Sequence, residues 1–88
     1  MTARIAQMAA CLQILQPISL EIIDESLLHA GHAGARDGGG HYVLKLCSAA
    51  FVGKNTMTRQ RMIYSALAEM MQHDIHALSI DAKAPNEL

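Results

Sequence analysis

Apolar residues recur at helical spacing at the start of the chain. A stripe over residues 1–15 has the period of about 3.6 residues that is typical of an amphipathic helix, which we expect to pack on a sheet. We expect the helix to end before Pro17, because proline disfavours a helical conformation in the residue that precedes it. The apolar positions of this stripe are Met1, Ile5, Met8, Leu12 and Leu15.

Three later segments alternate between apolar and polar residues and predict strands, because successive side chains of a strand point to opposite faces. They are residues 18–25, 41–47 and 75–82. In the third segment His76 has the parity of Leu78, which predicts that the histidine faces the same way. The predicted inward positions of the first two segments are Ile18, Leu20, Ile22, Tyr42, Leu44 and Leu46. The predicted solvated face carries Ser19, Glu21, Lys45, Ser79 and Asp81.

The order of elements predicts the fold class. We expect residues 29–40, which hold five of the six glycines, to form a loop. A connector is predicted over residues 48–56. A second helix is predicted over residues 58–72, and its buried positions are Ile63, Ala66, Leu67 and Met70. The order helix–strand–strand–helix–strand predicts an α+β two-layer sandwich. The first two strands pair antiparallel, and the crossover makes the last two parallel with right-handed connection. We expect one domain over residues 1–88, with 84–88 as a short tail that frays.

Composition and charge narrow the function classes. The formal net charge of −1 argues against a general nucleic-acid binder, although residues 38–68 contain four cations and no acidic residue. The chain has no run of 18 apolar residues, so we expect no membrane span. Its two isolated cysteines, Cys11 and Cys47, favour a reducing cytoplasm over a disulfide framework.

Histidines are the candidate functional residues. Five occur in 88 residues, and four of them form two His-x-x-His pairs, His29 with His32 and His73 with His76, while His41 opens the second strand. Neutral imidazole is a good ligand for Zn, Cu, Ni and Fe. Simpler roles are also open. His73, near a helix end, would complement the helix dipole, and His76, at the edge of the core, would form a hydrogen bond to the backbone. His29 and His32 would be ordinary polar loop residues.

The donor count favours a shared metal site. A zinc or iron–sulfur site usually needs four ligands, and no cysteine lies near either histidine pair in the sequence. Ligation by two imidazoles and two thiolates is known from Rieske centres, so the thiolates would come from another molecule. No catalytic triad, phosphate-binding loop or carboxylate pair is evident. We therefore expect neither enzymatic activity nor a small-molecule substrate.

Several short motifs resemble the BolA-like family in the right order along nearly the whole chain. They are Phe51-Val-Gly-Lys54, Arg59-Gln-Arg-Met-Ile-Tyr64, Leu67-Ala-Glu69 and Ile75-His-Ala-Leu78, with Leu20–Ser26 and His41 also fitting. The resemblance implies a fold related to the class II KH domain. It also implies a complex with a monothiol glutaredoxin, in which the two proteins share a [2Fe-2S] cluster and the chain alone binds no cofactor tightly.

The resemblance also implies roles for individual residues. In the family the partner provides a cysteine thiolate and a glutathione thiolate, and the histidine of the His-Ala-Leu motif, here His76, is a cluster ligand. The second ligand comes from the loop between the first two strands, where His29 matches best and His32 is the alternative.

Two other functions remain open at this point. Some relatives are described as transcriptional regulators, and in a DNA-binding protein of this fold Lys54, Arg59 and Arg61 would contact phosphates. A third hypothesis is metal storage or sensing by the two histidine pairs without a partner.

Overall fold

A three-stranded mixed sheet forms one layer of the protein. The computed structural model describes residues 3–25 and 40–87. The strands are β1 (Ser19–Asp24), β2 (Gly40–Cys47) and β3 (Ile75–Lys83), in the spatial order β1-β2-β3. β1 pairs antiparallel with β2, and β2 pairs parallel with β3, which confirms the predicted topology. The central strand is therefore held by backbone hydrogen bonds on both sides.

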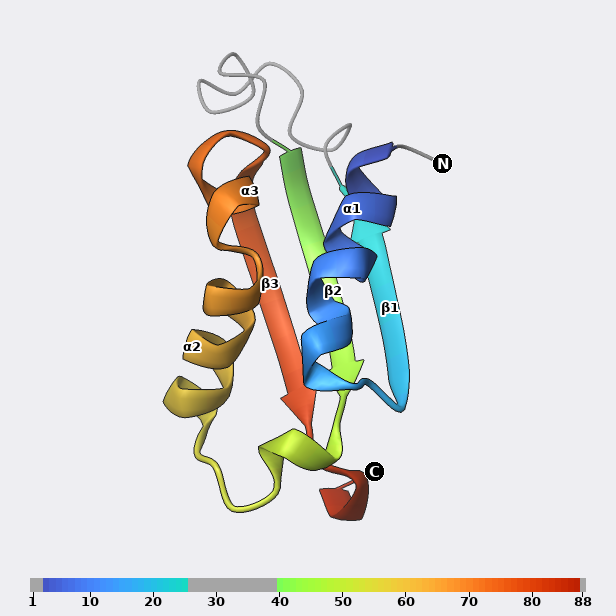
Figure 1. Cartoon of the computed structure of the whole chain (residues 1–88), viewed down its shortest axis with the longest axis vertical. Helices are drawn as coiled ribbons and strands as arrows, with labels where there is room; N and C mark the ends of the chain where they lie inside the picture. Colours follow the sequence, from blue (N-terminus) through green and yellow to red (C-terminus); the bar gives the residue numbers. More distant parts are fainter. Residues whose placement is uncertain (1–2, 26–39, 88) are drawn as a thin grey trace.

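The helices form the second layer and cover one face of the sheet (Figure 1). Within the described ranges, no helix is long and apolar enough to cross a membrane. The helical segments are α1 (Ala3–Leu12), η1 (Gln13–Leu15), η4 (Ala49–Phe51), α2 (Thr56–Ala66), α3 (Ala68–His73) and η5 (Pro85–Glu87), of which the η segments are short 3-10 helices.

The predicted stripe of the first helix packs on the sheet. Met8 and Leu12 are fully buried, Leu15 is buried in the following 3-10 helix, and Ile5 packs against the same core. Met1 lies outside the described residues. The helical period of the apolar residues therefore predicted this face correctly.

The inward side of the strands agrees with the alternation except at its first residue. Tyr42, Leu44 and Leu46 of β2 are buried, and Leu20 packs against them from β1. The prediction was wrong for Ile18, which directly precedes β1 and is 61% exposed. Its backbone N–H donates to the Cys47 carbonyl, but its side chain lies outside the core.

The predicted helix over residues 58–72 is two helices. α2 ends at Ala66 and α3 begins at Ala68, with the backbone of Leu67 at φ −100° and ψ 12° between them. The side chains of Ile63, before the break, and Leu67, at the break, are fully buried, as predicted. Met70, after the break, is nearly so. The apolar period thus continues through the break, which is why the pattern alone predicted a single helix.

Candidate functional site

The candidate site lies at the end of the sheet where β2 and β3 begin. Parallel strands start at the same edge, so the residues that open them are neighbours: Gly40 pairs with Ile75. The Gly40 N–H also donates to the carbonyl of Asp74, with 3.0 Å between nitrogen and oxygen. This edge therefore brings together two segments that lie about 35 positions apart in the sequence.

His76 is exposed because the pairing of β2 and β3 is irregular at this edge. Gly40 pairs with Ile75, but the next residue, His41, pairs with Ala77, so His76 is an extra residue in β3. Such an insertion locally interrupts the alternation of faces. Buried Ile75 is thus followed by two exposed residues before Leu78 turns inward. The prediction that His76 faces the same way as Leu78 was wrong for this reason.

His41 lies beside His76, a proximity that the sequence did not indicate. The two ring centroids are 5.2 Å apart, and the ring planes are tilted by 50°. His41 is half-buried in the central strand, whereas His76 is exposed on the edge strand. One feature of the sequence prediction could have indicated this proximity. The second and third strands were predicted to be parallel, and parallel strands begin at the same edge of a sheet.

The loop histidines of the sequence prediction, His29 and His32, lie outside the described residues. The described ends of that segment lie at this same edge of the sheet. Glu25, the last described residue before it, donates its N–H to the His41 carbonyl over 2.8 Å, and Gly40 is the first described residue after it. Glu25 and Gly40, the described residues on either side of that segment, thus both lie next to His41.

His73 belongs to a different surface. It is exposed in the last turn of α3, the position where a histidine complements the helix dipole, and it lines a groove between α1 and α3 with half-buried Cys11 and Asp74. Arg4 of α1 lies 3.8 Å from the Asp74 carboxylate across this groove. In the part of the chain that the structure describes, no group of three or more His, Cys, Asp or Glu residues is arranged to hold a metal ion.

Arg59, one of the three candidate phosphate contacts, is bound within the fold. Its guanidinium makes two hydrogen bonds of 2.6 and 2.7 Å to the carboxylate of Glu87 in η5, and others to the carbonyls of Lys54 and Ala82. It also lies 5.9 Å above the ring of buried Phe51. The Arg59 side chain is only 11% exposed. These contacts join the start of α2 to the segment after β3.

The same contacts shift the pKa values of both partners. The hydrogen bond from Arg59, together with one from the Ala84 N–H, lowers the pKa of the Glu87 carboxyl from 4.5 to about 2. The hydrogen bond to Glu87 in turn raises the pKa of Arg59 above its ordinary value. The sequence predicted a fraying tail over residues 84–88. Glu87 of this tail is instead tied to α2, because its carboxylate accepts two hydrogen bonds from the Arg59 guanidinium.

Lys54 and Arg61, the other two candidate phosphate contacts, are exposed. Lys54 lies in the turn before α2, next to Gly53, whose φ of 77° is the left-handed conformation that glycine adopts readily. The following Asn55 caps α2, its side-chain oxygen accepting the Thr58 N–H over 2.8 Å. The structure therefore places the two cations on the surface, Lys54 in the turn before α2 and Arg61 in the middle of α2.

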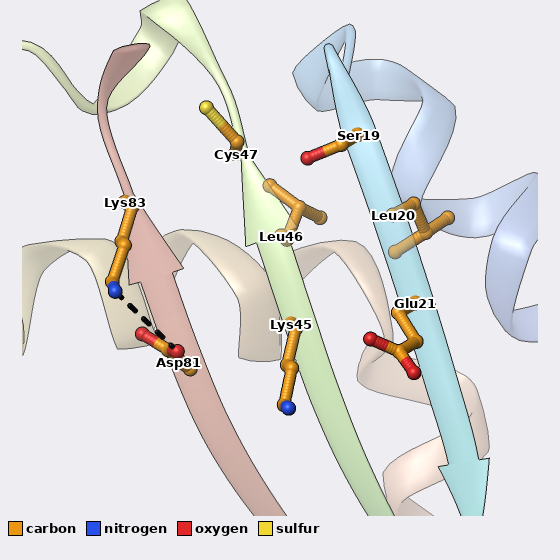
Figure 2. Close-up of a pocket in the computed structure, with 8 residues that line it drawn as sticks. All are labelled: Ser19, Leu20, Glu21, Lys45, Leu46, Cys47, Asp81 and Lys83. Carbon is orange, nitrogen blue, oxygen red and sulfur yellow. Dashed lines mark ion pairs between the residues drawn. The ribbon is translucent and has the colours of Figure 1, made fainter. Parts of the chain in front are cut away.

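The sheet face opposite the helices is solvated, as predicted. Residues of all three strands line a depression on this face, and Figure 2 shows Lys45 of the central strand between side chains of the two outer strands. Glu21, Lys45 and Asp81 form one cross-strand row of alternating charge, and Lys83 lies 3.9 Å from Asp81. Opposite charges on neighbouring strands offset one another, so this depression has no concentrated charge of either sign.

Comparison with known proteins identifies a family for this fold and sequence. The BolA-like protein family matches residues 12–87. SufE-like protein 1 of Arabidopsis thaliana is 44% identical over an alignment of 79 positions, which covers 84% of this chain and 21% of that protein. The DNA-binding transcriptional regulator BolA of Escherichia coli is 42% identical over 65 residues, which are 74% of this chain and 59% of the regulator. The chain thus spans less than two thirds of the length of these curated relatives.

A solved structure agrees with the sequence comparison. The BolA domain of SufE1 from Arabidopsis thaliana superposes with a TM-score of 0.87 at 38% identity and covers 100% of this chain and 99% of that one. The α+β class and the three-stranded mixed sheet are therefore shared with a solved relative. Family match, sequence identity and fold agree, and the chain belongs to the BolA-like protein family.

Proposed function

We propose that this protein is a non-catalytic adaptor in iron–sulfur cluster assembly or trafficking, which binds a monothiol glutaredoxin with glutathione and shares a [2Fe-2S] cluster with it. The observation that carries the proposal is the exposure of His76 at the edge of the sheet. A ligand that completes a cluster held by another protein must be accessible from outside. The strand irregularity turns this imidazole away from the core, as such a role requires.

The donor set supports sharing rather than binding by this chain alone. His76 supplies one imidazole, and His29 or His32 would supply a second. Two thiolates are still needed for the mixed ligation that Rieske centres exemplify. Cys47 is only 2% exposed and lies at the opposite end of β2 from His41, about 20 Å away at 3.3 Å per residue. A cysteine and a glutathione on the partner would supply the missing sulfurs.

Anaerobic reconstitution tests the proposal. The glutaredoxin, glutathione, iron and sulfide are combined with and without this chain, and the cluster is followed by visible circular dichroism. We expect the spectrum to change when the chain is added, and His76→Ala to abolish that change. His73→Ala is the matched control. His73 is also an exposed histidine and stands only three positions before His76 in the sequence, but it belongs to a different surface, the groove between α1 and α3. A full spectral change with His76→Ala would show that the ligand assignment is wrong.

The same assay identifies the second ligand. His29→Ala and His32→Ala are compared one at a time, and only the variant that removes a ligand should lose the change in the spectrum. Loss with both variants would mean that both imidazoles are needed. Loss with neither would assign the second ligand to another residue.

DNA binding is a second candidate function. It is favoured by exposed Lys54 and Arg61, by the absence of acidic residues over residues 40–68, and by the name of the Escherichia coli relative. Arg59 is less suited to contact phosphate because its guanidinium is already bound to Glu87. With two phosphate contacts, the logarithm of the binding constant should fall against the logarithm of salt concentration with a slope of about −2. Fluorescence anisotropy with a labelled DNA duplex measures this slope, and Lys54→Ala combined with Arg61→Ala should remove it.

A further inference from the structure

The two neighbouring histidines at the candidate site differ in how firmly they are held. His41 belongs to the central strand, is half-buried, and has its Nε2 atom buried. His76 belongs to an edge strand, is exposed, and occupies the extra position of the strand irregularity. His76 is thus the more exposed of the two imidazoles, and the half-buried ring of His41 lies beside it.

The backbone contacts point the same way. The carbonyl of His41 accepts the N–H of Glu25, the residue directly after β1, over 2.8 Å, and on its other side His41 is in register with Ala77 of β3. The preceding Gly40 N–H donates to the Asp74 carbonyl over 3.0 Å. His41 is therefore anchored from both neighbouring strands, while His76 is passed over in the register between β2 and β3.

An exposed imidazole at an irregular strand end would populate several rotamers unless a neighbour restricts it. The ring of His41 is such a neighbour, because its centroid lies 5.2 Å from that of His76, within the range of favourable contacts between aromatic rings. We infer that His41 is a positioning residue that holds the His76 imidazole ready for the partner's cluster. This inference rests on the proposed function. A ligand fixed before binding gains affinity, because less conformational entropy is lost in the complex.

Substitutions of His41 separate a positioning role from a ligand role. His41→Ala removes the ring and should weaken binding of this chain to the cluster-loaded glutaredoxin about 2- to 12-fold, the range expected for one aromatic contact. His41→Phe retains a ring without nitrogen donors and should restore most of that loss. The spectrum of the bound cluster should keep the same form in both variants, because His76 is still present.

A second measurement uses the protein without partner or cluster. The imidazole carbon-bound protons of His76 are followed by NMR, after assignment with His76→Ala. We expect His41→Ala to shift these signals and to increase the mobility of the ring, and His41→Phe to keep the ring restrained. His73→Ala should change neither property. Because no cluster is involved, this measurement stands even where the proposed function fails.

The outcomes distinguish the alternatives. Loss of the cluster spectrum with His41→Phe, as complete as with His76→Ala, would make His41 a ligand and overturn the inference. Unchanged affinity and unchanged His76 ring mobility with His41→Ala would overturn it as well. Urea unfolding checks that each variant is folded, and His41→Leu, which keeps apolar volume without a ring, replaces His41→Ala if that variant is unfolded. Failure of His76→Ala to affect the cluster would overturn the proposed function and, with it, the purpose assigned to the contact, whereas the NMR measurement would still show whether His41 restrains the His76 ring.

Discussion

Gly40 stands directly before the histidine pair, and we expect its replacement by alanine to destabilise the protein for a steric reason. A Cβ atom built at this position would lie 2.5 Å from Cε2, 2.6 Å from Oη and 2.7 Å from Cζ of the Tyr42 ring. Real Cβ contacts are essentially never shorter than 3.0 Å, so the ring would have to move. Tyr42 is only 3% exposed and packs in the core, which leaves the ring little room.

The cost follows from overpacking a buried ring. Adding a methyl group to a well-packed core typically costs about 1–3 kcal/mol. For a domain of this size each kcal/mol corresponds to about 4–8 °C in Tm, so Gly40→Ala should lower Tm by about 5–20 °C. Thermal and urea unfolding followed by circular dichroism measure the loss. Gly53→Ala is the matched control, because Gly53 has no atom within 4 Å of its built Cβ but a φ of 77°. Its cost of about 1 kcal/mol is conformational and does not depend on Tyr42.

A double-mutant cycle isolates the contact. In a Tyr42→Leu background the ring is absent, so adding Gly40→Ala should cost little further stability. In a Tyr42→Phe background only the Oη contact is relieved, and two of the three short contacts remain. Gly40→Ala should therefore still be destabilising there. An equal loss of stability in the wild-type and Tyr42→Leu backgrounds would refute the steric explanation, as would a Gly40→Ala variant that is as stable as the wild type.

Two further predictions concern hydrogen bonds that join distant parts of the chain. The pKa of Glu87 is lowered from 4.5 to about 2 by Arg59, so this carboxylate stabilises the fold above pH 4.5 and loses that effect as the pH falls from 4.5 through 2. Between pH 4.5 and pH 2, the free energy of unfolding in urea should fall more for the wild type than for Glu87→Gln. An equal fall in both proteins would contradict the stabilising role of the Glu87 carboxylate. The buried Ser48 hydroxyl donates to the Leu15 carbonyl over 2.5 Å, so Ser48→Ala should cost about 1–3 kcal/mol by leaving that carbonyl without this donor. The exposed Ser79→Ala should stay within about 0.5 kcal/mol of wild type, and equal effects of the two serine variants would argue against the bond.

The sequence by itself determined the elements whose side-chain period is regular. Met8, Leu12 and Leu15 follow the helical period, and the alternation of residues 41–47 predicts which side of β2 is buried. Both patterns report which side of one element loses contact with water, and this is a local property. The order of elements with the handedness of crossovers was then enough to predict the mixed sheet.

The tertiary structure alone decided the details of the candidate site. The outward position of His76 depends on an extra residue in the pairing of β3 with β2, which the alternation within β3 does not reveal. The engagement of Arg59 depends on Glu87, a residue 28 positions away that the fold brings to its guanidinium. The contact between His41 and His76 likewise joins two strands. Each of these features arises from register or proximity between segments distant in sequence, whereas a periodic pattern describes only one segment at a time.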